Sequence, residues 1–529
     1  TMNAPRLLTD TQVREFIVNG FITLQPDVAP EVHAEVHKML EFSFEHESWL
    51  GNNIVSRIPR MHDVLRSSVV HGAVTSIAGP DYYLHPHRAI HRNMPLEDNT
   101  LTFAADVNAP QMGKGSNSGS GWHQDAQSPL SRARHHVPRY VIGFYFPHDT
   151  PRAMGPTRMQ AGSYLYAHPV EPRAVVLPEH IEAGTFMLVH FDMFHAGFPN
   201  LADAARFMVK FVFTRTRHPQ TPAWDSHSNV WQRPESTIPD FDLPETWGYL
   251  WHWLRGDQGH ASSPSQPSHL ADLNSKDQIA RLHAIYGVGD STPLTELADL
   301  LTATAGHDKH NRALAADKDG NVLPRDAADS TARRWNERAV VMEDATYALA
   351  VVGPRAVPLL TTLLSQSDPW VQINAVFALG EIGPAARDSV ADISCLLTSP
   401  LQQVVRQALD ALGAIGCGLG SALPAIRDLM DGGNPTWQTA QVGRGWTGED
   451  QVQVNAMFTL LNAVNTGENL AEIESILTDF GITSSNGYVS AVAAEALVRI
   501  GSVTSQSAAI QYLSDRRWDE SLRTTQKPF

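Results

Sequence analysis

The segment Arg206-Phe207-Met208-Val209-Lys210-Phe211-Val212-Phe213-Thr214 has the alternation of a half-buried strand. Successive side chains of a strand point to opposite faces, so the odd-numbered positions, three Phe and one Val, form one apolar face. Arg206 must then point to the other face. Similar short apolar or alternating runs recur between residues 82 and 216, for example at residues 140–146 and 186–189. Together they predict a β region of the sandwich or barrel type.

Helical patterns flank this β region. Thr9-Asp10 can cap a helix over residues 11–19, and residues 30–44 repeat apolar side chains at three- and four-residue spacing. Residues 247–253 predict an aromatic helix that closes the region. The Gly/Ser run at residues 112–121 lacks the order GxxxxGK[ST] and leads into a strand. We therefore interpret that run as a loop and not as a phosphate-binding site.

Composition limits the classes of protein that need to be considered. The chain has 529 residues, enough for about three domains, and its 42% hydrophobic and 18% charged residues are typical of a folded protein. A formal net charge of −16 argues against nucleic acid or an anionic membrane as the main partner. We find no secretion signal and no run of about 18 apolar residues. We expect a cytoplasmic protein that binds a small molecule or another protein.

The C-terminal half contains a recurring phrase. After a Ser- and Pro-rich stretch at residues 262–268, nearly everything has the pattern of amphipathic helix. The phrase is a small-residue run ending in Gly, found at residues 284–289, 348–353, 378–383, 411–416 and 496–501. Its clearest copies begin 30 and 33 residues apart, at 348, 378 and 411, which is room for a pair of helices.

This pattern resembles HEAT-like repeats over residues 345–430 and 450–501, and less well over residues 276–338. Residues 432–448 interrupt it. We predict a first domain at residues 1–255, a linker at 256–276 and an all-α HEAT-like solenoid at 277–529. The concave face of such a solenoid is the usual binding surface. Cys395 and Cys417 lie in this part, are too few for a disulfide framework, and are expected to be buried thiols.

The motif Trp122-His123-Gln124-Asp125 is the sharpest chemical feature. On an extended strand His123 and Asp125 share a face, so an imidazole and a carboxylate can bind one metal ion. One further imidazole would complete the facial triad of non-haem Fe(II) sites, which leaves three positions open. We take His195, 70 residues downstream of Asp125, as the third ligand. Arg206 follows eleven residues later, and its guanidinium could hold a carboxylate through two parallel hydrogen bonds.

A second His-x-Asp pattern, His190-Phe191-Asp192, competes with this assignment. The histidine that would complete it beyond His195 is His218, only 26 residues later, and no arginine follows at a suitable spacing. If residues 188–195 form one strand, His190 and His195 face opposite sides and at most one can reach the metal. We favour His195. The sequences His85-Pro86-His87 and His135-His136 are interpreted as solvated residues or as neighbours of the ligands.

The order of WHQD, Gly155 to Tyr164 (GPTRMQAGSY), HAGFPN and Arg206 is similar to that of the phytanoyl-CoA dioxygenase family of Fe(II)/2-oxoglutarate oxygenases. The resemblance covers about half of the chain. It implies a double-stranded β-helix (jelly-roll) fold with flanking helices, with iron held by His123, Asp125 and His195. It also implies that Arg206 binds the distal carboxylate of 2-oxoglutarate. The sequence departs from the family at Ala161 and Tyr164, where Pro and His are common, and at Gly197, where Ser is frequent.

The resemblance implies a dioxygenase that uses Fe(II), 2-oxoglutarate and O2 to oxidise an aliphatic C–H of a small molecule, most often by hydroxylation. Succinate and CO2 would be the coproducts. Asp125 argues against halogenation, which requires that ligand position to be vacant. Two alternatives stay open: a HEAT-repeat protein-binding scaffold with an inactive or regulatory oxygenase domain, and a protein hydroxylase whose solenoid captures its substrate. Self-association through the solenoid is a further possibility, and the sequence does not identify the substrate.

Overall fold

The computed structural model describes residues 4–47, 51–96, 122–125, 133–167, 173–257, 270–305, 342–439, 441–443 and 446–515. The Gly/Ser run at 112–121 lies outside these residues. The strands of the first half are β1 (Phe21–Leu24), β2 (Tyr83–Asn93), β3 (Tyr140–Tyr145), β4 (Thr150–Pro151), β5 (Thr157–Gln160), β6 (Val175–Val176), β7 (His180–Ile181), β8 (Phe186–His190), β9 (His195–Gly197) and β10 (Arg206–Thr214). Its helices are α1 (Asp10–Asn19), α2 (Pro30–His46), α3 (Ile54–Arg57), α4 (Met61–Leu65), α5 (Ser68–Ala78) and α6 (Pro244–Arg255).

An antiparallel sheet forms the core of this half, with the strand order β1-β8-β3-β10-β2. A smaller antiparallel sheet has the order β6-β5-β9, and β4 pairs with β7. Strand β10 lies between β3 and β2 and is buried along its whole length. The alternation predicted for residues 206–214 is therefore that of a strand with two different buried faces, one apolar and one with polar positions.

Helices cover the apolar face of β10. The Phe207 ring lies 5.4 Å from the ring of Phe44 in α2, and α5 also contacts β10. Helices α1 and α2 occupy the ranges that the sequence predicts, and Thr9 and Gln12 form a capping box at the start of α1. The edge strand β1 between them was not predicted. Only its four residues pair with β8, too few for a clear alternation.

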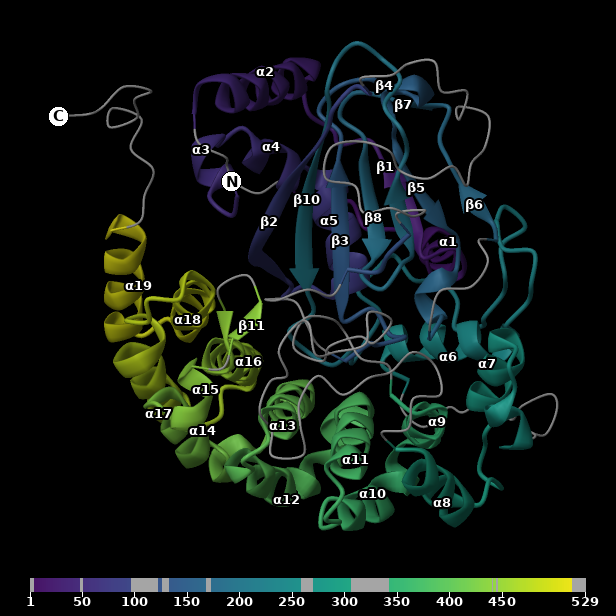
Figure 1. The fold of residues 1–529 in the computed structure, drawn as a ribbon, viewed down its shortest axis with the longest axis vertical. Coiled ribbons are helices and arrows are strands. Elements are labelled where there is room, and N and C mark those ends of the chain that lie inside the picture. The colour runs from purple at the N-terminus through teal and green to yellow at the C-terminus, as the bar shows by residue number, and fades with distance from the viewer. Residues whose placement is uncertain are drawn as a thin grey trace.

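The second half is an array of paired helices, as its repeated phrase predicts. Figure 1 shows these helices as an arc that runs under the sheet from α7 to α19. They are α7 (Gln278–Tyr286), α8 (Leu294–Thr304), α9 (Asp344–Val352), α10 (Val357–Leu363), α11 (Pro369–Ile382), α12 (Val390–Cys395), α13 (Gln402–Ile415), α14 (Leu423–Met430), α15 (Pro435–Thr439), α16 (Gly448–Ala463), α17 (Leu470–Ile476), α18 (Gly487–Ile500) and α19 (Val503–Asp515). The short strands β11 (Gln441–Gly443) and β12 (Trp446–Thr447) fall in the predicted interruption. Cys395 is exposed and Cys417 half-buried, so the expectation of two buried thiols was wrong.

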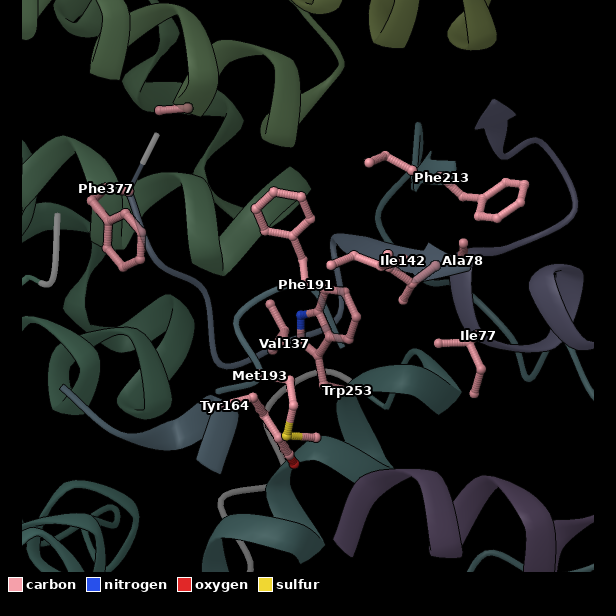
Figure 2. Packing of buried hydrophobic residues seen from close by; sticks show 14 of the residues in the cluster. Ile77, Ala78, Val137, Ile142, Tyr164, Phe191, Met193, Phe213, Trp253 and Phe377 are labelled. Atoms are coloured by element: carbon pink, nitrogen blue, oxygen red, sulfur yellow. The ribbon is translucent and has the colours of Figure 1, made fainter. Parts of the chain in front are cut away.

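The concave side of the arc is filled by the first half of the same chain (Figure 1). In the described residues the concave face therefore contacts the chain's own first half. The buried hydrophobic residues of both halves form one continuous cluster. Figure 2 shows Val137, Phe191 and Trp253 of the first half close together, with Phe377 of α11 on the solenoid side. Helix α11 is buried on nearly all sides, because it packs against its neighbours and against the first half.

Histidines of the first half line this internal interface. The His136 ring stacks on Tyr347 at 4.2 Å and its Nδ1 lies 2.7 Å from the Tyr286 hydroxyl. The His85 ring stacks on Phe458 at 5.1 Å, and Nδ1 of His87 lies 3.1 Å from the hydroxyl of Tyr488. The interpretation of these histidines as solvated residues or as neighbours of the metal ligands was therefore wrong. Their side chains contact the solenoid.

One stretch of the described residues, Asp344–Leu363, is long and apolar enough to cross a membrane by length and composition. It comprises α9, a 3₁₀ turn at Gly353–Ala356 and α10. Both helices pack against α11 and α8, and just over half of the stretch is buried inside the structure. Buried core helices of soluble proteins meet the same criteria of length and composition, so the stretch is weak evidence for a membrane span.

Glu381 of α11 is the charged centre of the interface. Its Oε1 atom lies 2.7 Å from Nδ1 of His135 and accepts a hydrogen bond of 2.9 Å from Nε of Arg139. Burial alone would raise the pKa of Glu381, but the charges of His135 and Arg139 and their hydrogen bonds lower it to about 2. The stabilisation is thus present above the ordinary pKa of 4.5 and is lost as the pH falls towards 2.

We expect Glu381→Ala to lower the free energy of unfolding by about 3 kcal/mol at neutral pH, because it leaves Arg139 buried without its carboxylate. Chemical denaturation measures this loss. Glu179→Ala removes the exposed carboxylate that pairs with Arg152 and serves as the matched control, with an expected loss below about 1 kcal/mol. Equal losses for the two variants would contradict a central role for Glu381.

Candidate metal centre

His123 and His195 lie directly opposite each other on neighbouring extended segments. The His123 amide donates to the carbonyl of His195 at 3.1 Å, and the His195 amide donates to the carbonyl of His123 at 3.0 Å. Residues paired in this way present their side chains on the same face. The two imidazole rings are accordingly only 4.4 Å apart between centroids. One antiparallel bridge thus brings together two histidines that are 72 residues apart in the sequence.

Asp125 follows on the same face as His123 and completes the group. Its Oδ2 atom lies 3.7 Å from Nε2 of His195. One ligand atom from each of His123, Asp125 and His195 can be chosen so that all three lie within 4.8 Å of one another. Burial alone would raise the pKa of Asp125, but the positive charge of Lys210 and its hydrogen bond to the carboxylate lower it. The carboxylate is therefore ionised and available as a ligand.

The tautomer of His195 suits metal binding. Its Nδ1 atom lies 2.9 Å from the carbonyl oxygen of Met193, so Nδ1 carries the hydrogen and donates it. The lone pair is then on Nε2, the atom nearest Asp125. Burial and the neighbouring His123 lower the pKa of His195 to about 4, which keeps the ring neutral at neutral pH. A backbone carbonyl that fixes the ring in this way is typical of metal-bound histidines.

The donor set therefore fits a divalent metal of the facial-triad kind. Two imidazoles and one carboxylate are the ligands found at non-haem Fe(II) sites. A closed structural zinc site would need four protein ligands. Among the described residues, no second group of three His, Cys, Asp or Glu side chains comes together in this way.

Arg206 is buried at the start of β10. Its Nε donates to the carbonyl of Gly155 at 3.2 Å, and burial lowers its pKa to about 10. Gly155 has φ +70°, and a Cβ atom there would lie 2.2 Å from the carbonyl oxygen of Phe198, so a side chain would not fit. Within the described part of the chain, no carboxylate lies within 4.0 Å of the Arg206 guanidinium. A buried guanidinium without an acidic partner suits an anionic ligand.

Lys210 is a site residue that our sequence analysis missed. Its Nζ atom lies 3.0 Å from Oδ2 of Asp125. Lys210 and Arg206 are both even-numbered positions of β10, so they share the face opposite the apolar one. Phe144 on β3 is the register partner of Lys210, and its ring lies 5.4 Å from that of His195. The polar face of β10 is thus the one that faces the metal ligands, and the strand alternation could have identified Lys210.

The competing pair His190 and Asp192 has a structural role. Strand β8 ends at His190 and the chain turns before β9, so the premise of one strand through both histidines was wrong. Nε2 of His190 lies 3.1 Å from the carbonyl of His136, and Nδ1 accepts from the Asp192 amide at 3.2 Å. With both ring nitrogens bonded to backbone, His190 has no lone pair left for a metal ion. His218 packs against Trp253 at the interface.

Five further residues of the first half differ in what they contact: His91, Asn93, Arg158, Tyr145 and Arg88. His91 is the register partner of Met208 on β10, and burial together with the nearby positive charges of Lys210 and Arg206 lowers its pKa to about 3, so its ring is neutral at neutral pH. Asn93 supports Gly155, to whose carbonyl it donates at 3.1 Å. The Arg158 guanidinium lies 4.9 Å from the centre of the Trp122 ring, beside the ligand strand. Tyr145 instead contacts His33 on the helical side, and Arg88 contacts Asn52.

Comparisons with known proteins give two kinds of similarity. A family model for HEAT repeats matches residues 356–441. No curated protein matches the chain. Similar solved structures include the non-heme monooxygenase ThoJ, with 18% identity over 42% of this chain and 89% of that chain and a TM-score of 0.29.

Two further solved structures are of related kinds. The non-heme alpha ketoglutarate dependent carbocyclase SnoK, from nogalamycin biosynthesis, shares 15% identity over 41% of this chain and 88% of its own, with a TM-score of 0.31. EctD from S. alaskensis, solved with 2-oxoglutarate and 5-hydroxyectoine, shares 14% identity over 48% of this chain and 85% of its own, with a TM-score of 0.31. ThoJ and SnoK are thus described as non-heme enzymes, EctD was solved with 2-oxoglutarate, and the match to HEAT repeats lies in the second half of this chain.

Proposed function

We propose that the chain is an Fe(II)- and 2-oxoglutarate-dependent dioxygenase that oxidises an aliphatic C–H of a small molecule, with hydroxylation as the outcome. The observation that carries this proposal is the convergence of His123, Asp125 and His195 within 4.8 Å. The two facing antiparallel sheets are consistent with a double-stranded β-helix. In this assignment residues 1–255 are the oxygenase domain, 256–276 the linker and 277–529 the repeat domain.

The side chains have distinct tasks in this proposal. His123, Asp125 and His195 hold the iron on one side, which leaves three positions for cosubstrates. The bound metal would supply the redox chemistry that couples O2 and 2-oxoglutarate to oxidation of the substrate, with succinate and CO2 as coproducts. The Met193 carbonyl orients His195. Arg206 binds the 5-carboxylate of 2-oxoglutarate through its forked guanidinium.

The position of the solenoid favours a small-molecule substrate over the two alternatives. A protein-binding scaffold and a protein hydroxylase would both use the concave face to capture a partner. In the described residues that face contacts the first half of the chain, through His135, His136 and Arg139. We infer that the solenoid acts as an internal support for the oxygenase domain.

Metal-dependent turnover of 2-oxoglutarate tests the proposal. The 529-residue chain, stripped of metal and then supplied with Fe(II), should convert 2-oxoglutarate to succinate in the presence of O2, and addition of a substrate should accelerate the conversion. Succinate is measured by mass spectrometry. Omission of Fe(II) or O2 provides the controls. A protein that binds neither a divalent metal nor 2-oxoglutarate would refute the proposal.

A further inference from the structure

A buried cation lies beside the metal ligands. The side chain of Lys210 is 7% exposed, and its Nζ atom is 3.0 Å from Oδ2 of Asp125. Charged lysines are almost never this buried unless they are paired, because removal of the ammonium from water is costly. In the described part of the chain Asp125 is the only carboxylate that pairs with it. Lys210 is therefore held in place by the same carboxylate that would bind the metal.

The fold fixes this arrangement. Lys210 lies in the middle of β10, where Phe144 on β3 and Ala89 on β2 are its register partners. Strand pairing on both sides leaves its backbone no freedom to move away. Any ion bound to Asp125 comes within a few ångström of the ammonium, because Lys210 already contacts that carboxylate.

We propose that Lys210 weakens the binding of a bare divalent cation to Asp125 and strengthens the binding of 2-oxoglutarate beside that cation. This inference rests on the proposed function. The ammonium repels a divalent cation, and this repulsion is twice that between two unit charges at the same distance. The same ammonium attracts a dianion that binds next to the metal. Lys210 thus makes the binding of the metal and of the cosubstrate depend on each other, and the site is most stable when both are bound.

A competing effect has the opposite sign. The hydrogen bond from Lys210 also orients Asp125, and loss of such an orienting partner typically weakens metal binding about 10- to 100-fold. The repulsion is the larger of the two effects. The interaction energy of two unit charges about 4 Å apart near a protein surface already exceeds the free energy that corresponds to a hundredfold change in affinity. The net expectation is tighter metal binding when the charge is removed.

Isothermal titration calorimetry of the whole 529-residue chain with Ni(II), and of the Ni(II)-loaded chain with 2-oxoglutarate, tests the proposal. Lys210→Met, which keeps the length of the side chain, should bind Ni(II) at least about tenfold more tightly. It should bind 2-oxoglutarate at least about tenfold more weakly. Lys210→Arg keeps the charge and should resemble the wild type in both titrations. Opposite changes are the signature of a charge effect, since damage to the site would weaken both.

Three results would overturn the inference: weaker binding of both ligands to Lys210→Met, no change in either, or the same changes in Lys210→Arg. If Lys210→Met does not fold, Lys210→Gln removes the charge and keeps a hydrogen-bond donor for Asp125, with the same expected signs. Failure of the wild-type protein to bind Ni(II) or 2-oxoglutarate would instead refute the proposed function. The two failures are therefore distinguishable.

Discussion

His195→Ala is expected to abolish Fe(II)-dependent conversion of 2-oxoglutarate to succinate. The variant leaves two ligands, His123 and Asp125, and these cannot hold the metal with the geometry of the triad. The Met193 carbonyl would also lose its partner. The rate of succinate formation and the affinity for Ni(II) measure the effect. Succinate formation should fall to the rate seen without metal, and Ni(II) binding should be lost.

The matched control for this variant is His190→Gln. It changes His190, the last residue of β8, and replaces the imidazole with an amide that keeps a hydrogen-bond donor for the His136 carbonyl. Because His190 is not a ligand in our assignment, this variant should keep metal-dependent activity, with some loss of stability. If His190→Gln loses the metal and His195→Ala keeps it, the metal site has been assigned to the wrong histidine.

Arg206→Met is expected to weaken 2-oxoglutarate binding about 100-fold and to leave metal binding intact. Two charge-assisted hydrogen bonds would be lost, and each contributes about 1.5–3 kcal/mol. Part of this loss is offset because the 5-carboxylate regains contact with water. Titration of the Ni(II)-loaded protein with 2-oxoglutarate measures the change.

Two further variants define what Arg206 does. Arg206→Lys keeps a charge but not the fork, so its affinity should fall between those of the wild type and Arg206→Met. Arg173→Met removes an arginine from an exposed ion pair with Asp240 and should have no effect. Unchanged 2-oxoglutarate binding in Arg206→Met would show that another cation holds the carboxylate.

The sequence predicted the local elements well because their signals are local. The alternation of residues 206–214 identified β10 and the face on which Arg206 lies. Thr9 identified the start of α1. The Ala- and Gly-rich phrases identified the ends of inner helices such as α11 and α13, where the glycines at 383 and 416 adopt positive φ. Each of these predictions depends on residues within about one turn or a few strand positions.

The sequence could not predict what depends on pairing between distant segments. The contact of Lys210 with Asp125 spans 85 residues, and that of His135 with Glu381 spans 246. Periodicity shows which face a residue occupies but not which segment covers that face. For the same reason the histidines at 85, 87, 135 and 136 were interpreted without their partners in the solenoid.

The shared core has a practical consequence for dissection of this protein. A fragment ending at residue 255 would expose Val137, Phe191 and Trp253 to water, together with Arg139 deprived of Glu381. The isolated repeats would likewise expose Phe377 and the inner sides of α11 and α13. Either piece is expected to aggregate when expressed alone. We therefore expect the two halves to fold as one unit, so that loss of activity in a truncated chain would say nothing about which half carries out the chemistry.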